Sequence, residues 1–258
     1  MQCLEEYQEL IERDAIEISW LWKYLQMFLY LLCTISGYTC SVLFYILWKE
    51  IFGDKCPLWA TSVLISKEKL ELDDIRDICK NHLLDWWKYI FTDYIHENTC
   101  EMYLITCFSS CIFGVVWFTL FLMCGKGGQD IPIYESPWRI VFPAIYFNFI
   151  FAIISMYAYY NLQQGYKSFN DGIINISYEI YSICKVPMNI SDREIINIYM
   201  KMHNFYIYDV YYIISYLQIF TVIMMCSWSG GLIILILRMI LVIDFKILKI
   251  RIYEVKEE

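Results

Sequence analysis

LQMFLYLLCTISGYTCSVLFYILW, residues 25–48, carries no charged side chain and only one glycine. An α-helix rises about 1.5 Å per residue, so about 20 such residues cross a hydrocarbon core of about 30 Å. The stretch therefore predicts a membrane-spanning helix.

Three more apolar stretches are long enough to cross a membrane as helices. Residues 102–124 again lack any charge, and residues 140–160 contain only Pro143 and Asn148 as unusual members. The short connection 125–139 predicts an antiparallel pair of helices. The fourth stretch, 208–243, is longer than a perpendicular helix needs, and a single crossing is favoured. The extra length is explained by a tilt, by an interfacial Tyr-rich start or by extension past the membrane to Arg238. A split at Ser229-Gly230-Gly231 is the alternative, although neither half would be long enough to span.

Composition points to the same class of protein. Apolar residues make up 59% of the chain, against about 45–50% in soluble domains. The net charge of −8 disfavours nucleic acid or an anionic lipid surface as a partner. The first span is expected to act as an uncleaved anchor, because acidic residues dominate the segment before it: Glu5, Glu6, Glu9, Glu12, Asp14 and Glu17.

The segments outside the spans show some helical periodicity. Residues 1–24 carry a thin apolar stripe, which predicts an acidic amphipathic helix. Residues 66–98 show a stronger stripe formed by Leu72, Ile75, Cys79, Leu83, Trp86 and Ile90. The expected fold is thus an all-α membrane protein, a four-transmembrane-helix bundle with a partly helical, Cys-containing outer region in loops 49–101 and 161–207, and a cytosolic tail at 244–258.

Sequons and cysteines indicate which loops face outward, since Lys and Arg counts do not decide it. Asn175-Ile176-Ser177 and Asn189-Ile190-Ser191 both fall in 161–207, so Asn175 and Asn189 are candidate glycosylation sites. The two loops also hold an even set of disulfide candidates, with three possible connectivities: Cys56, Cys79, Cys100 and Cys184. Both termini are then expected in the cytosol, where Cys3 and Cys124 are candidate lipidation sites.

Residues that could carry chemistry are sparse. The first three spans have no ionisable side chain at membrane depth, and Asp209 lies at the mouth of the fourth. A zinc site from His82, His96 and the nearby cysteines Cys79 and Cys100 fits no compact ligand pattern, and disulfides compete for the thiols. We expect no enzyme activity, no metal and no cofactor.

Small residues on two of the spans predict close helix packing. Ser110 and Gly114 form such a face on the second span, and Ser227, Ser229, Gly230 and Gly231 form one on the fourth.

Short motifs along residues 25–245 resemble the transmembrane protein 179 family of tetraspan membrane proteins. They are Gly53-Asp54-Lys55-Cys56, Cys100 before the second span, Leu122-Met123-Cys124-Gly125-Lys126-Gly127-Gly128 after it, and Phe205-Tyr206-Ile207-Tyr208-Asp209. The acidic segment at the start departs from that family. The resemblance implies four spans and a membrane location, and it transfers no catalytic residue.

The expected function is therefore non-enzymatic. The chain is predicted to sit in the plasma membrane or an endomembrane as an accessory subunit or scaffold of a hetero- or homo-oligomeric complex. Trp86, Trp87 and Asp209 are the candidate contact residues. The alternative is an oligomeric pore-forming channel subunit, in which Asn148, Gln218 and Thr221 would line a shared path.

Overall fold

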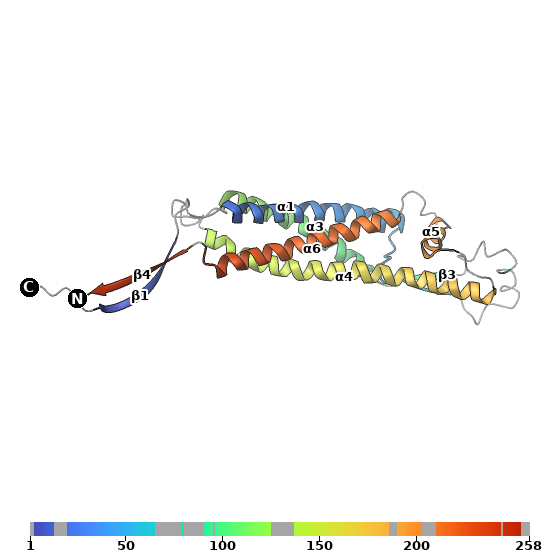
Figure 1. The fold of residues 1–258 in the computed structure, drawn as a ribbon. Coiled ribbons are helices and arrows are strands. Elements are labelled where there is room, and N and C mark those ends of the chain that lie inside the picture. The colour runs from blue at the N-terminus through green and yellow to red at the C-terminus, as the bar shows by residue number, and fades with distance from the viewer. Residues whose placement is uncertain are drawn as a thin grey trace, which may run out of the picture. The chain divides into compact units, whose positions relative to one another are not determined.

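The computed structural model describes residues 3–12, 20–64, 79, 90–94, 96–124, 137–185, 190–202, 210–243 and 245–253. The described residues include four long helices, α1 (Trp20–Tyr45), α3 (Glu97–Cys124), α4 (Pro137–Ile183) and α6 (Val210–Ile240), which can be followed in Figure 1. All four are long and apolar enough to cross a membrane, as predicted. A π-helix, η1 (Ile46–Ile51), continues α1. Helix α6 is continuous through Ser229-Gly230-Gly231, so the alternative split at this point is wrong.

The third helix is longer than expected. Helix α4 continues past the predicted end at residue 160 to Ile183, and α5 (Asp192–Met202) follows, so most of the region 161–207 is not a loop. The physical reason is a buried apolar stripe at alternating spacings of four and three, which continues the helical face: Leu162, Tyr166, Phe169, Ile173, Ile176 and Ile180.

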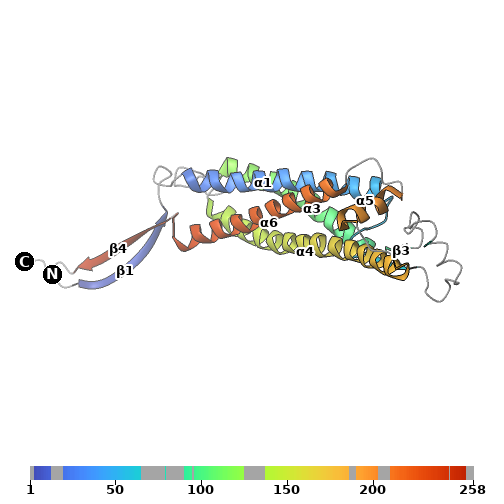
Figure 2. The same cartoon turned by 45° about the vertical axis from the view of Figure 1, so that its right-hand side comes forward.

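The segments that flank the helices form a β-ribbon. Strand β1 (Cys3–Glu12) pairs antiparallel with β4 (Phe245–Tyr253), and both views show the two side by side (Figures 1 and 2). The predicted amphipathic helix is therefore wrong for residues 3–12, and part of the tail is a strand. The register places Glu6 opposite Arg251 and Gln8 opposite Lys249, so an acidic strand pairs with a basic one.

A second ribbon joins β2 (Thr61–Leu64) to β3 (Ile90–Asp93). Ile90 was expected on the amphipathic helix and is instead the first residue of β3, where it pairs with Leu64. Cys79 is helical, as predicted, while most of the predicted helix lies outside the described residues. The fold is thus mostly helical, and the two ribbons correct the all-α expectation.

The chain divides into two compact units. The first holds Met1–Ser36, Ser110–Ser155 and Ile223–Glu258, and the second holds Gly37–Ser109 and Met156–Val222. The four boundaries along the chain fall one inside each long helix, so each unit contains one part of α1, α3, α4 and α6.

Aromatic rings fill the interior of the first unit. Tyr30 lies 5.5 Å from Phe121 and 5.9 Å from Trp228, measured between ring centroids, and Trp228 stacks on Phe151 at 4.6 Å. The Trp228 indole also donates a hydrogen bond of 2.8 Å to the Ser110 hydroxyl. These side chains tie all four helices of the unit together.

Asn148 and two glycines mark places where the helices of this unit approach closely. The Asn148 amide donates hydrogen bonds of 2.7 Å to the Tyr30 hydroxyl and to the Ala144 carbonyl. A Cβ at Gly231 would lie 2.6 Å from Asn148 Oδ1, and one at Gly114 would lie 2.5 Å from Thr34 Oγ1. The predicted small-residue faces therefore pack against neighbouring helices within this unit.

The second unit has its own buried polar cluster. The hydroxyls of Tyr103 and Thr221 are 2.5 Å apart, and Cys40 Sγ lies 3.6 Å from Thr221 Oγ1. Between α6 and α4, the Gln218 amide donates a hydrogen bond of 2.6 Å to Gln163 Oε1. Hydrogen bonds thus link α1, α3, α4 and α6 in the second unit as well.

Candidate interaction region in the second unit

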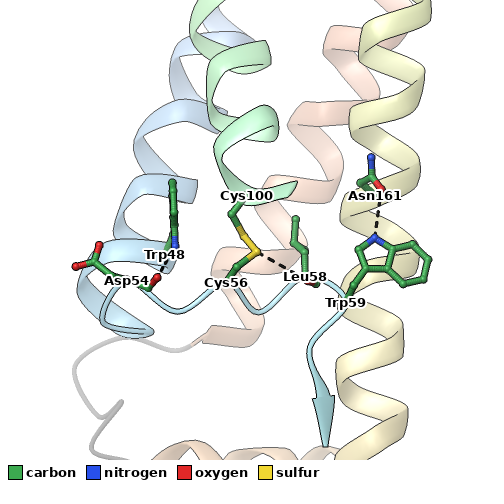
Figure 3. The surroundings of a disulfide bond; sticks show 7 residues. All are labelled: Trp48, Asp54, Cys56, Leu58, Trp59, Cys100 and Asn161. Atoms are coloured by element: carbon green, nitrogen blue, oxygen red, sulfur yellow. Dashed lines mark hydrogen bonds between the residues drawn. A yellow bond between two sulfur atoms is a disulfide. The ribbon is translucent and has the colours of Figure 1, made fainter. Parts of the chain in front are cut away.

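A disulfide anchors the segment that leaves the first helix. Cys56 is bonded to Cys100 at the start of α3, with Cα atoms 5.8 Å apart (Figure 3). Gly53 and Asp54 have positive φ of 56° and 68°, which turns the chain sharply after η1. The turn is held by the Trp48 indole, which donates to the Asp54 carbonyl at 3.1 Å.

Charge and stacking reinforce the same turn. Lys49 Nζ lies 2.5 Å from Asp54 Oδ1 and 4.1 Å from the centre of the Trp48 ring. Cys56 Sγ lies 3.8 Å from the Leu58 carbonyl, a contact rather than a donated hydrogen bond because a disulfide sulfur carries no proton. The segment therefore leaves the helix in one defined direction.

Trp59 fixes this segment to α4. Its indole donates a hydrogen bond of 3.2 Å to Asn161 Oδ1, and its backbone N–H donates to the Gly165 carbonyl at 3.1 Å (Figure 3). Trp59 has φ of 62°, a conformation that costs a non-glycine residue about 1–2 kcal/mol. A Cβ at Gly165 would lie 3.0 Å from Trp59 Cδ1 and 3.1 Å from Leu58 Cβ, so only glycine lets the segment approach this closely.

Hydroxyl groups link the second ribbon to α5. The Ser62 and Thr92 hydroxyls, opposite one another in the ribbon, are 3.0 Å apart, and Thr92 Oγ1 lies 2.8 Å from the Tyr199 hydroxyl. Burial raises the pKa of Tyr199 above its usual value, so the phenol stays protonated and can serve as a donor. The ribbon and α5 consequently form one layer.

The second disulfide closes the region. Cys79 is bonded to Cys184, just past the end of α4, with Cα atoms 5.4 Å apart. Lys185 follows with φ of 53°, the left-handed conformation common at helix ends. All four predicted disulfide candidates are thus paired, and the structure selects one of the three connectivities. Neither Cys79 nor Cys100 has a free thiol for the zinc site considered above.

An exposed apolar pair lies on the ribbon. Val63 and Phe91 are opposite one another in the register, and their side chains are 52% and 56% exposed. Neighbouring side chains on one face of an antiparallel pair make a continuous surface. Val63 and Phe91 therefore form an exposed apolar pair that lies outside the long helices.

Of the two predicted glycosylation sites, the structure describes only Asn175. Asn175 is exposed but lies within α4, and the buried Ser177 hydroxyl of its sequon donates to the Ile174 carbonyl at 2.7 Å. The expected loop position is therefore wrong, and glycosylation of Asn175 stays a prediction. Asn189 lies outside the described residues.

The remaining candidates are not brought into this region by the described structure. Trp86, Trp87 and Asp209 lie outside the described residues. Cys3 begins β1 and Cys124 ends α3, and neither side chain is described. Lipidation at these two positions stays a prediction.

Sequence reasoning did not identify Trp59, Asn161 and Gly165. The signal that could have suggested them is the change from apolar to amide-rich sequence at Asn161-Leu162-Gln163-Gln164-Gly165 with no helix breaker before Gly165. Across the described ranges, no group of three or more His, Cys, Asp and Glu side chains is placed to hold a metal ion.

Comparison with known protein families, with curated proteins and with solved structures found no match to this chain.

Proposed function

We propose that the chain is a four-span integral membrane protein with both flanks in the cytosol, which acts through contacts as an accessory subunit or scaffold of a larger membrane complex. The observation that carries the proposal is the direction of the side chains: many polar groups form hydrogen bonds inside their own unit, while large apolar groups on the long helices are exposed.

Every long helix presents apolar side chains outward. Phe28, Phe108, Ile153 and Ile219, one from each helix, are 52% to 60% exposed. Burying apolar surface contributes about 25 cal/mol per Å², so exposure on this scale is unfavourable in water. A lipid environment removes that cost, and the internal hydrogen bonds of the helices satisfy the backbone there.

The first ribbon supports an even number of crossings. Strand β1 precedes the four helices in the chain and β4 follows them, yet the two strands pair directly. Pairing requires both strands on the same side of a membrane, which four crossings provide and three or five do not.

The disulfides support the orientation. Disulfides persist in oxidising compartments and are rare in the cytosol. The pairs Cys56–Cys100 and Cys79–Cys184 both lie in the second unit, beside the segments between the first and second helices and between α4 and α6. We therefore assign the disulfide-bonded segments of the second unit to the luminal or extracellular side and the first ribbon to the cytosol.

The pore alternative is less well supported. Asn148 and Thr221 are fully buried and hydrogen-bonded within their own units, and Gln218 is bonded to Gln163. These side chains do not form an exposed polar stripe that copies of the chain could share. The resemblance to the transmembrane protein 179 family agrees with the proposed topology and stays a prediction.

The test is co-purification of the tagged chain from native membrane in mild detergent. We expect a reproducible set of membrane proteins to copurify with the wild type and to be depleted with Phe91→Asp, which places a charge on the exposed ribbon pair. Asp93→Asn, an exposed change on the same strand, is the matched control and should retain the set. A monomeric chain that recovers no reproducible partner contradicts the proposal, as does thiol labelling that places the second unit in the cytosol.

A further inference from the structure

A pocket lined by charged side chains lies among α4, α5 and α6 in the second unit. It has a volume of about 620 Å³, within the range of about 300–1,000 Å³ usual for small-molecule sites. Its lining includes buried apolar side chains from three helices, among them Tyr166, Met200 and Ile214. The pocket therefore combines an apolar wall with a polar rim.

The rim carries a cation that is held in place. The Arg193 guanidinium lies 4.2 Å from the centre of the Tyr211 ring, and both residues line the pocket. Stacking uses the face of the guanidinium and leaves its in-plane N–H groups available for a carboxylate or phosphate. Positioning before binding lowers the entropy cost of capturing an oxyanion.

An acceptor for a cation lies in the same pocket. Asp171 is exposed on α4, one helical turn after Lys167, and both residues line the pocket. Neither of them, nor Arg193, forms an ion pair with another residue in the described part of the chain. Side chains one turn apart on a helix can pair, so the absence of a Lys167–Asp171 bridge leaves both charges available.

A buried acceptor points to a ligand that donates hydrogen bonds. Asn170 and Tyr166, one helical turn apart on α4, both line the pocket. The Oδ1 atom of Asn170 is buried and has no hydrogen-bond partner among the described residues. A buried acceptor without a partner is unfavourable, and an ammonium group of a ligand would offset that cost.

We infer that this pocket binds a small zwitterion, with its oxyanion on Arg193 and Lys167 and its ammonium group on Asp171 and Asn170. A free metabolite and an aminophospholipid headgroup share this chemistry. The pocket has both signs of charge and both acceptor and donor groups, which a simple anion or a simple amine would use only in part.

The test uses the full-length protein in detergent micelles and titration calorimetry with phosphoethanolamine. We expect saturable binding, weakened at least tenfold by Arg193→Gln and by Asp171→Asn, and unchanged by Lys201→Gln, a cation on α5 outside the pocket lining. Phosphocholine, which lacks N–H donors, should bind at least tenfold more weakly, as should inorganic phosphate and ethanolamine separately.

A second arm separates the two sources of the zwitterion. Reconstitution in phosphatidylethanolamine nanodiscs should abolish phosphoethanolamine binding if the lipid headgroup occupies the pocket, and phosphatidylcholine nanodiscs should leave it intact. Binding that persists in both indicates a free zwitterion. The inference is overturned if phosphoethanolamine and glycine both fail to bind in micelles, or if Arg193→Gln and Asp171→Asn, shown to be folded by unchanged gel-filtration behaviour, bind as the wild type does.

Discussion

Replacing Gly165 with alanine is expected to destabilise the second unit, whereas the same replacement at Gly172 on the same helix should stabilise it. A Cβ at Gly165 would lie 3.0 Å from Trp59 Cδ1 and 3.1 Å from Leu58 Cβ. The tryptophan cannot easily retreat because Asn161 holds its indole, and the Cβ of Leu58 moves only with the backbone.

The magnitudes follow from two opposing effects. Overpacking costs about 1–3 kcal/mol, and alanine gains about 1 kcal/mol over glycine inside a helix, so Gly165→Ala should lose up to about 2 kcal/mol. At Gly172 the nearest atom, Ser62 Cβ, would be 3.5 Å from the new Cβ, which is ordinary van der Waals contact. Gly172→Ala should therefore gain about 0.5–1 kcal/mol.

Denaturant unfolding of the two variants in the same detergent, followed by tryptophan fluorescence, measures the difference between them. The midpoints should move in opposite directions from that of the wild type. If Gly165→Ala is as stable as Gly172→Ala, the segment around Trp59 does not approach α4 as described, and the reasoning fails.

Three further outcomes are expected in the same unfolding assay. Cys56→Ser combined with Cys100→Ser opens a loop of 44 residues, and loop entropy predicts a loss of about 4 kcal/mol; an unchanged midpoint would show that the bond does not form. Trp59→Phe removes an indole hydrogen bond and should cost about 1 kcal/mol, so a gain in stability would contradict that bond. Tyr30→Phe deprives the buried Asn148 amide of one acceptor and should lower the free energy of unfolding by about 1–2 kcal/mol. An unchanged midpoint would show that water replaces the lost acceptor inside the first unit.

The long helices could be predicted because their signal is local. A run without charges, such as residues 25–48, identifies a helix suited to lipid without knowledge of any other segment. The same rule stopped the third helix too early, because residues after Tyr160 become polar. Their buried stripe, which includes Phe169 and Ile173, continues the helix by packing inside the protein rather than by contact with lipid.

The ribbons and the site depend on partners that are distant in sequence. Residues 3–12 have a weak helical stripe of their own, and only the basic strand at Phe245–Tyr253 makes the extended conformation favourable. The disulfide cysteines could be named from sequence, but their connectivity could not. Trp59 and Gly165 matter only because the chain brings them together.

The first ribbon also constrains the order of assembly. Its strands flank all four long helices, so β1 stays without its partner until β4, which follows α6, has been synthesised. During that time β1 has unpaired edges, which can recruit a chaperone or a second chain. Pairing of the two strands would then be the last step of folding. Under the proposed topology, a helix that failed to insert would leave the two strands on opposite sides of the membrane.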